Sequence, residues 1–273
     1  MKPIKKIALL HSMCSVGKAS ITNMTPILSV LGVEVCPLPT ILLSTHTGGY
    51  GIPAMQKTTA EFIRSCANHY YENGVTFDMI FVGYLGSTEI AEATEYFVSK
   101  FPETIVCVDP IMGDHGTFYS NLGQAYADAY QTLLPYADIL LPNLTEGCLL
   151  TGRTYIDDMS ESEILEICNE LKDKGAKHII LTSVPGKEGT KNIALSTKHQ
   201  SEIFNFKELK NEFHGSGDAF DAVLTGYYLQ GMCLKDCIEK AHQFVCSCIM
   251  ESVKYPYPER EGLLIEKTLS LLV

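Results

Sequence analysis

The residues best suited to chemistry lie late in the chain, in the sequence Gly215-Ser216-Gly217-Asp218, directly before an apolar stretch over 219–229. That stretch has the apolar spacing of a helix. Glycines at a helix start let the backbone turn tightly and present N–H groups, and the helix dipole adds partial positive charge there. The sequence therefore predicts an anion-binding turn with a carboxylate, Asp218, beside it. An ordinary helix start with a well-placed acid is the competing interpretation, because short glycine motifs also occur by chance.

Further polar side chains follow the apolar stretches that we expect to be strands. In a parallel sheet the carboxyl ends of the strands meet at one edge, where ligands of α/β proteins bind. Carboxylates suit Mg²⁺, which usually arrives with substrate phosphates. An anion hole, magnesium and one free carboxylate together favour phosphoryl transfer. The side chains expected at this edge are Ser12, Tyr84, Asp109, Asp114, Asn143, Glu146, Thr182 and Ser183.

Strands and helices are expected to alternate along most of the chain. The pattern predicts an α/β fold over 1–273 as one domain, with a mostly parallel central sheet and helices on both faces. The predicted strands are 4–10, 33–37, 77–82, 104–108, 138–141 and 177–181, and an antiparallel pair is expected at 192–196 and 202–206. The main predicted helices are 16–31, 55–71, 87–100, 122–134, 161–174 and one after 261. Residues 38–52 are expected to form a strand that runs into a glycine-rich turn.

The bulk composition excludes several classes of partner. The chain has 273 residues, 21 basic and 32 acidic, and a net charge of −11, which argues against binding to nucleic acid or to an anionic membrane. No stretch has the length of a membrane span, and the basic start at 1–6 is not followed by a long apolar run. Ten cysteines without CxxC spacing indicate a cytoplasmic protein with reduced thiols, of which Cys14 is expected to be the most accessible.

The glycine motif at 215–218 and the sequence Asn143-Leu144-Thr145-Glu146 resemble the ribokinase-like superfamily, whose members phosphorylate hydroxymethyl groups with ATP. Four stretches of the first half resemble the pyridoxal and pyridoxamine kinases in particular. They are 32–35, 44–48, 83–86 and 109–114, and they occur in the order of that family. The resemblance implies a ribokinase-like fold, a B6 vitamer as the small-molecule substrate and ATP with Mg²⁺ as cofactors. It also implies a homodimer, and many members respond to K⁺.

The resemblance also implies roles for individual residues. Asp218 would take the proton from the 5′-hydroxymethyl group, and the amides of Gly215, Ser216 and Gly217 would stabilise the transferred phosphoryl group. The residues implied to bind the pyridine ring are Ser12, Thr47 and Tyr84. Those implied for magnesium are Asp109, Asp114 and Glu146, and those implied for the nucleotide are Asn143, Thr182 and Ser183.

This sequence departs from the family at two places. The loop after Ser12 is about three residues shorter than in many pyridoxal kinases, which leaves the preferred vitamer open, and Leu141 stands where some relatives have threonine, which removes one implied phosphate contact. A kinase for hydroxymethylpyrimidine or another small alcohol is an alternative within the same class. A vitamin-binding protein without catalysis is a second alternative, but it would have no need for a base at Asp218.

Overall fold

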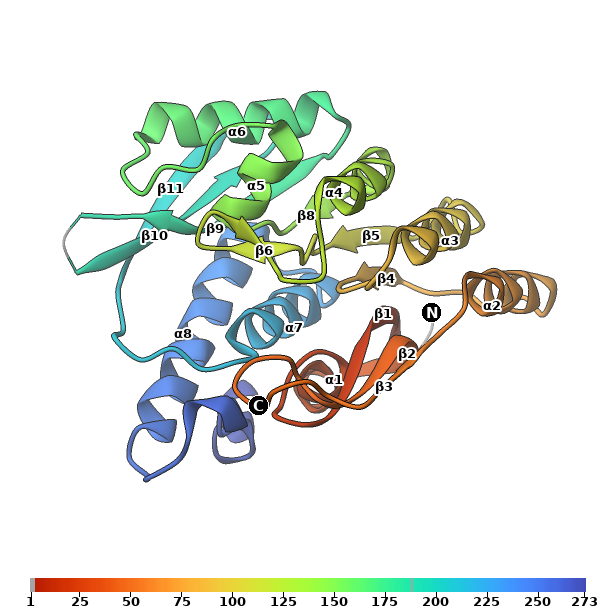
Figure 1. Ribbon diagram of the computed structural model, residues 1–273, viewed down its shortest axis with the longest axis horizontal. Helices are drawn as coiled ribbons and strands as arrows, with labels where there is room; N and C mark the ends of the chain where they lie inside the picture. The colour runs from red at the N-terminus through yellow and green to blue at the C-terminus, as the bar shows by residue number, and fades with distance from the viewer. Residues whose placement is uncertain (1–2, 188) are drawn as a thin grey trace. The chain divides into compact units, whose positions relative to one another are not determined.

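The computed structural model, drawn in Figure 1, describes residues 3–187 and 189–273. Its chain divides into two compact units. The first unit comprises Met1–Thr58, Phe77–Met79 and Leu209–Val273, and the second comprises Thr59–Thr76 and Ile80–Glu208. The expected single domain over 1–273 stays a prediction, and it includes residues 1, 2 and 188, which lie outside the described residues. Over 3–187 and 189–273, no helix is both long and apolar enough to cross a membrane.

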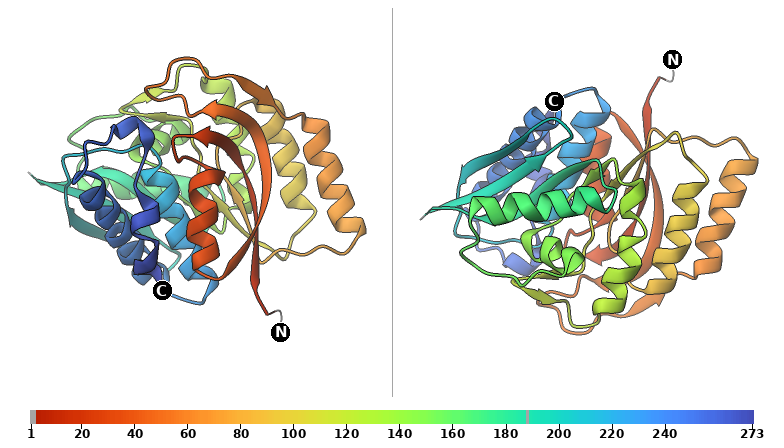
Figure 2. Two further views of the ribbon diagram at one scale, coloured as in Figure 1. Left: turned by 90° about the horizontal axis from the view of Figure 1, so that it is seen from below. Right: turned by 90° about the horizontal axis from the view of Figure 1, so that it is seen from above.

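The first unit is built on a parallel pair of long strands, β1 (Lys5–Val16) and β2 (Val33–Thr45), which curve along each other in Figure 2. A short strand, β3 (Met55–Lys57), pairs antiparallel with β2. The helix α1 (Ile21–Val30) packs on β1 and β2, and its Met24, Ile27 and Leu28 are fully buried. The remaining elements are α7 (Ser216–Leu229), α8 (Leu234–Ser252) and the short 3-10 helices η2 (Glu259–Glu261), η3 (Ile265–Lys267) and η4 (Leu269–Leu272).

The second unit is organised around short strands in the order β4-β5-β8-β9-β10-β11. Those strands are β4 (Met79–Val82), β5 (Ile105–Val108), β8 (Ile139–Leu140), β9 (His178–Pro185), β10 (Thr190–Ser196) and β11 (Ser201–Lys207). The helices are α2 (Ala60–Glu72), α3 (Thr88–Ser99), α4 (Gln124–Gln131), η1 (Leu134–Tyr136), α5 (Leu144–Thr151) and α6 (Glu161–Asp173). A separate hairpin joins β6 (Gly113–Asp114) to β7 (Thr117–Phe118).

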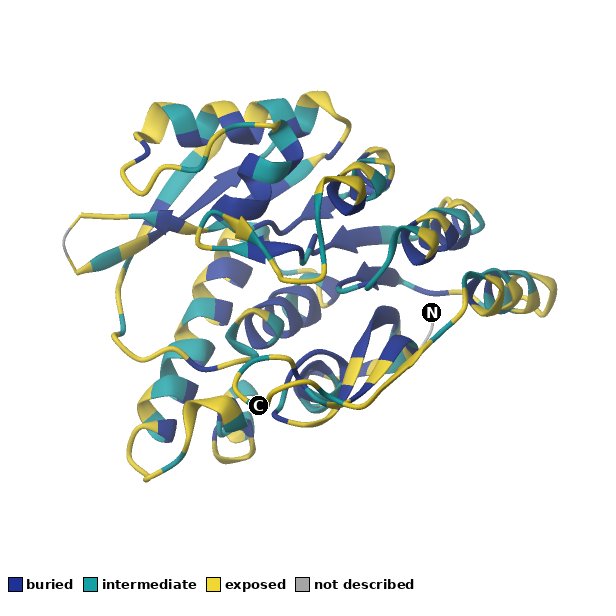
Figure 3. Cartoon of the chain, in the orientation of Figure 1, coloured by how far each residue is buried: buried dark blue, intermediate teal, exposed yellow. Residues whose placement is uncertain are grey.

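The burial pattern follows from the strand pairing. β5, β8 and β9 pair in parallel and carry runs of Val, Ile and Leu that are buried on both faces, as Figure 3 shows. β10 pairs antiparallel with both β9 and β11. Helices α2, α3 and α6 of this unit alternate buried and exposed residues, which is the pattern of helices that cover a sheet, whereas α5 is almost entirely buried. The expected α/β class with a mostly parallel sheet and the expected antiparallel pair are confirmed.

Two irregularities in strand register lie at predicted site residues. His11 of β1 pairs with Pro39 of β2, but Ser12 pairs with Ile41, so Thr40 is an extra residue. In β9, Leu181 pairs with Ala194 and Val184 with Asn192, so two residues of β9 face one residue of β10. Such bulges re-aim side chains and are common beside functional sites.

Several expected boundaries were wrong, for local reasons. β1 continues through Ser12 to Val16, so the helix expected from 16 begins at Ile21. The helix expected over 55–71 begins at Ala60, because the Thr59 hydroxyl caps it by accepting a hydrogen bond from Phe62 N at 3.1 Å. The last helix expected after 261 is a series of short 3-10 turns.

Candidate active site

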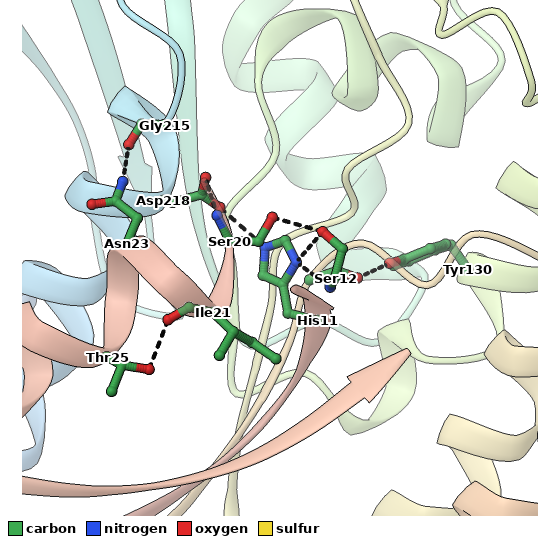
Figure 4. Close-up of polar contacts among 10 residues, drawn as sticks. His11, Ser12, Ser20, Ile21, Asn23, Thr25, Tyr130, Gly215 and Asp218 are labelled. Atoms are coloured by element: carbon green, nitrogen blue, oxygen red, sulfur yellow. Dashed lines mark hydrogen bonds and ion pairs between the residues drawn. The ribbon is translucent and has the colours of Figure 1, made fainter. Parts of the chain in front are cut away.

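The glycine motif forms the predicted turn at the start of α7 (Figure 4). Gly215 has φ +80°, in the left-handed region that favours glycine, and its carbonyl oxygen accepts a hydrogen bond from Asn23 Nδ2 at 2.6 Å. The Ser216 hydroxyl donates to the Phe213 carbonyl at 2.7 Å. Helix geometry leaves the amides of the first turn without an acceptor inside the helix. The Ser216 amide donates to the Phe213 carbonyl at 3.4 Å, so Gly217 supplies the first amide of the turn for an anion.

Asp218 lies in the first turn of α7, and both of its carboxylate oxygens are engaged. Oδ2 accepts a hydrogen bond from Ser20 N at 2.8 Å, and Oδ1 lies 3.1 Å from Nε2 of His11. The side chain is 11% exposed, so the carboxylate is held firmly yet still reaches the surface. Because a carboxylate can accept about four hydrogen bonds, it retains capacity to accept one from a substrate hydroxyl.

Ser12 lies in β1 and not at its end, in a small polar network beside Asp218 (Figure 4). Its hydroxyl is 2.7 Å from the hydroxyl of Ser20, and its backbone N–H donates to Nδ1 of His11 at 2.7 Å. Cys14, two residues further on, is buried, and burial together with the charge of Asp218 raises the pKa of its thiol to about 11. The structure therefore joins the implied ring-binding serine to the implied base.

Thr47 is exposed in the turn that follows β2, and this turn packs against the residue before the glycine motif. The rings of His46 and His214 are 4.4 Å apart, and a Cβ atom on Gly48 would lie 2.3 Å from the ring of His214. His46 also donates from Nε2 to the Arg260 carbonyl at 2.6 Å. Within the first unit, the structure thus brings the Thr47 turn to the start of the glycine motif.

In the second unit, Asn143 and Glu146 form a capping box at the start of α5. The Asn143 side chain accepts from Glu146 N at 2.9 Å, and Glu146 Oε2 accepts from Asn143 N at 2.9 Å. The same side chains hold the loop after β5, because Met112 N donates to Glu146 Oε1 at 3.0 Å and Asn143 Nδ2 donates to the Gly113 carbonyl at 2.9 Å. The pair therefore fixes the loop that carries Asp109 and Asp114.

The fit of these acids to magnesium can be judged from their surroundings. Glu146 is buried, and burial followed by the charge of Asp109 raises the pKa of its carboxyl well above the usual range. Asp114 is partly exposed and accepts a hydrogen bond from His115 N at 2.8 Å. Over 3–187 and 189–273, no group of three His, Cys, Asp or Glu side chains is arranged to hold a metal. Mg²⁺ commonly keeps waters and binds with substrate phosphates, so carboxylates such as those of Asp109 and Asp114 are the chemical type that this ion takes, and their role in holding it stays a prediction.

The other implied residues of this unit lie in two places, the bulge of β9 and the segment after β4. Thr182 and Ser183 lie within β9 at its bulge, where Ser183 has φ +54° and is exposed, and Thr182 N donates to the Pro142 carbonyl at 2.9 Å. Thr182 also pairs with Asn143 in an isolated bridge, so the structure brings these two together. Tyr84 follows β4, is half-buried, and its hydroxyl accepts from Asn121 Nδ2 at 2.8 Å.

Three residues that contact the site were not predicted from the sequence. They are His11 and Ser20, which hold Asp218, and Asn23, which holds Gly215. Ser20 has φ +60°, a strained conformation that no sequence pattern reveals. His11 was visible only as a polar residue at the end of an apolar run, a signal too common to assign a role.

Known proteins that are similar to this chain are kinases. A family model described as phosphomethylpyrimidine kinase matches residues 27–258. A hydroxymethylpyrimidine/phosphomethylpyrimidine kinase of Haemophilus influenzae is 29% identical over 177 residues, which cover 62% of this chain and 63% of that relative. Pyridoxal kinase PdxY of Corynebacterium diphtheriae is 28% identical over 252 residues, 86% of this chain and 84% of that protein.

A solved structure extends the likeness over nearly the whole chain. A candidate phosphomethylpyrimidine kinase from Bacteroides thetaiotaomicron, in a crystal form with pyridoxal, superimposes with a TM-score of 0.93 at 33% identity, covering 98% of this chain and 96% of that one. These relatives confirm the resemblance to the pyridoxal kinases and the ribokinase-like fold. The chain therefore belongs to the phosphomethylpyrimidine kinase family.

Proposed function

We propose that this protein is an ATP-dependent kinase that phosphorylates the 5′-hydroxymethyl group of a B6 vitamer: pyridoxal, pyridoxamine or pyridoxine. The observation that carries the proposal is the start of α7, where an anion-binding turn and a held carboxylate lie within four residues. A protein that only binds a vitamin has no use for that combination. Family membership supports the transfer of a phosphoryl group to a hydroxymethyl group on a small heterocycle.

In the proposed reaction, Asp218 accepts the proton of the substrate hydroxyl as its oxygen attacks the γ-phosphorus of ATP. The first-turn amides of α7 donate hydrogen bonds to the equatorial oxygens of the phosphoryl group, where negative charge is spread in the transition state: Gly217 directly, and Ser216 in place of its 3.4 Å bond to the Phe213 carbonyl. The positive end of the helix dipole acts in the same direction. The chain thus supplies a base and a fixed set of donors, and ADP leaves with the electron pair of the broken P–O bond.

The nucleotide is proposed to lie against the second-unit residues Asn143, Thr182 and Ser183. Asp109 and Asp114 would hold Mg²⁺ through water or directly, and the bound ion would neutralise charge on the phosphates. Glu146 is proposed to act mainly by fixing the loop between β5 and β6, because its carboxylate already accepts hydrogen bonds from the backbone.

The ring of the substrate is proposed to contact Ser12, Thr47 and Tyr84. The Ser12 hydroxyl has one donor and two acceptor positions, so its contact with Ser20 leaves it able to bind a rim atom of a pyridine. Tyr84 can offer an aromatic face. A B6 vitamer is favoured because the Bacteroides relative crystallised with pyridoxal, and hydroxymethylpyrimidine is the second candidate because of the family match.

The deciding experiment is an ADP-release assay with Mg·ATP and a panel of pyridoxal, pyridoxamine, pyridoxine and hydroxymethylpyrimidine. We expect turnover of the B6 vitamers, with pyridoxal and pyridoxamine both accepted. A value of kcat/KM for hydroxymethylpyrimidine ten times that of every vitamer would change the substrate and keep the kinase. Saturable binding of pyridoxal without ADP release from any compound would favour the non-catalytic binder.

A further inference from the structure

His11 is buried beside the proposed base, and the proposed reaction gives it no role beyond its contact with Asp218. Its side chain is 1% exposed and comes from β1, directly before the register shift between His11 and Ser12. Its Nε2 lies 3.1 Å from Oδ1 of Asp218, a residue 207 positions further along the chain (Figure 4). The hydrogen bonds around this buried ring identify which of its two nitrogens carries the proton.

The tautomer of His11 follows from the bond at its other nitrogen. The backbone N–H of Ser12 lies 2.7 Å from Nδ1, and an amide N–H can only donate. Nδ1 must therefore present its lone pair, and a neutral ring then carries its proton on Nε2. That proton lies in the contact with Asp218, so His11 donates a hydrogen bond to the carboxylate.

The two oxygens of Asp218 thus receive donors from different elements of the first unit. His11 Nε2 donates to Oδ1 from β1, and Ser20 N donates to Oδ2 from the segment before α1. Ser20 has φ +60°, so the chain is strained where it supplies this donor. With one donor on each oxygen, the carboxylate cannot rotate without breaking a hydrogen bond to a charged group, which is typically worth about 1.5–3 kcal/mol.

These hydrogen bonds do not suit His11 to relay a proton from Asp218 to another group. To take a proton from Asp218, the ring would need a lone pair on Nε2, and that nitrogen already carries its proton. To pass its own proton on, it would have to break the bond between Nδ1 and the Ser12 amide. The imidazole is therefore a fixed donor.

We infer that His11 is a positioning residue, which holds the Asp218 carboxylate in the orientation that accepts the proton of the substrate hydroxyl. This inference rests on the proposed kinase function. The backbone N–H of Ser12 donates to His11, and the Ser12 hydroxyl contacts Ser20. Ser12, which is implied to bind the ring, therefore belongs to the hydrogen-bond network that orients the Asp218 carboxylate. A change at His11 should therefore alter the chemical step and leave binding nearly intact.

The test is a mutant cycle of His11→Leu and Asp218→Asn, with kcat and both KM values measured. His11→Leu should lower kcat about tenfold to hundredfold, the range expected for one hydrogen bond to a charged group. The KM values for ATP and for the alcohol should stay within about twofold. In the Asp218→Asn background, His11→Leu should lower kcat no further, because His11 acts only through that carboxylate.

Two more variants separate positioning from folding. His11→Gln should recover most of kcat, because its side-chain amide can donate to Asp218 from a similar position. His242→Leu removes a half-buried histidine of α8 and should leave kcat unchanged. If His11→Leu does not fold, His11→Gln and a ¹⁵N spectrum of histidine-labelled wild-type protein still test the inference. The spectrum should show His11 with its proton on Nε2.

The outcomes distinguish the inference from the proposed function. Near-wild-type kcat for Asp218→Asn would remove Asp218 as the base, and the inference with it, whereas a wild-type protein that releases no ADP with any vitamer would overturn the proposed function. If Asp218→Asn is inactive while His11→Leu keeps wild-type kcat, the inference fails and the kinase stands. A further loss of kcat in the double mutant, or a proton on Nδ1 of His11, would also overturn the inference.

Discussion

A Cβ atom on Gly215 would lie 2.2 Å from the carbonyl oxygen of Lys18, far closer than two such atoms can approach. Gly215 also has φ +80°, so both the space and the backbone require glycine there. Gly217 has neither constraint, because a Cβ atom at that position would meet no heavy atom within 4 Å. Gly215 is therefore required for the shape of the turn, and Gly217, which has no side chain, leaves open space beside the backbone of the turn.

Alanine should lower stability at Gly215 and should lower activity, with little effect on stability, at Gly217. Gly215→Ala should destabilise the protein by at least about 1–2 kcal/mol, the usual cost of a left-handed backbone for a residue with a Cβ. Gly217→Ala should leave stability within about 1 kcal/mol of wild type, since glycine in a helix is about 0.5–1 kcal/mol worse than alanine. Its kcat/KM for ATP should fall at least about tenfold, because a methyl group would occupy the space proposed for the phosphoryl group. Urea unfolding and steady-state kinetics measure the two effects.

Gly123→Ala is the matched control for kinetics, because Gly123 starts α4 and a Cβ there also meets open space. It should leave kcat/KM for ATP unchanged. A Gly217→Ala variant with wild-type kcat/KM for ATP would show that the phosphoryl group does not approach this turn.

Glu146 should make stability depend on pH in the direction opposite to most carboxylates. Burial, followed by the charge of Asp109, raises its pKa well above the usual range in the folded protein. The protonated form is therefore favoured by folding. Its contribution to stability is fully present below the pKa of the unfolded chain and is lost as the pH rises through the folded pKa. Each pKa unit between the two states corresponds to about 1.4 kcal/mol.

Urea unfolding of wild type and Glu146→Gln between about pH 4.5 and pH 9 tests this direction. The free energy of unfolding of wild type should fall relative to that of the glutamine variant as the pH rises, because only the wild type must bury a charge. Glu163→Gln provides a control, since Glu163 is an exposed member of the capping box of α6 and its hydrogen bonds with Ser160 lower its pKa. A wild type that gains stability over Glu146→Gln with rising pH would contradict the prediction.

The fold class was predictable because buried parallel strands are short apolar runs with helices between them. The residues at which the strands end were not predictable. β1 and β9 continue past their apolar runs into polar residues, and only the register shows the bulges at Ser12 and at Thr182. The pairing of β3 with β2 was also missed, because Met55–Lys57 has no strand-like alternation and lies directly before a helix.

The types of residue in the candidate site could be predicted from the sequence, but most of the contacts between them could not. The glycine motif at the start of α7 has its own local signal. The capping box of Asn143 and Glu146 also has one, an Asn followed three residues later by Glu, and it could have been read from the sequence. The contact between His11 and Asp218 spans 207 positions, and no local pattern encodes it.

The reactivity of the thiols differs from the expectation for Cys14. Cys14 was expected to be the most accessible cysteine, but it is buried in β1, and burial and the charge of Asp218 raise its pKa to about 11. Cys233, the residue that precedes α8, is exposed. A thiol reagent at pH 8 should label Cys233 first and Cys14 only on unfolding, because the thiolate is the reactive form.

Mass spectrometry of the labelled protein over time identifies the order, and Cys233→Ser should remove the fastest phase. The half-buried Cys36, Cys66 and Cys246 should follow more slowly, since burial raises the pKa of each. Labelling of Cys14 in the native protein as fast as Cys233 would show that β1 opens around the proposed base.

The role of Asp218 can be separated from that of an ordinary helix acid by comparing it with Asp236. Both are acids in the first turn of a helix, but α8 follows Cys233 as its N-cap and lacks the Gly-Ser-Gly sequence that stands directly before Asp218. Asp218→Asn should lower kcat by about 10²–10⁴, the usual contribution of a general base, with little change in the affinity for pyridoxal. Some stability should be lost too, because asparagine offers one acceptor oxygen where Ser20 N and His11 Nε2 need two. Asp236→Asn should lose only a helix-dipole contribution of about 0.3–1 kcal/mol and keep wild-type kcat.

Steady-state kinetics, pyridoxal binding by absorbance and thermal unfolding of the two variants give the comparison. Equal and small effects on kcat would mean that Asp218 is only a helix-capping acid and that another group accepts the proton.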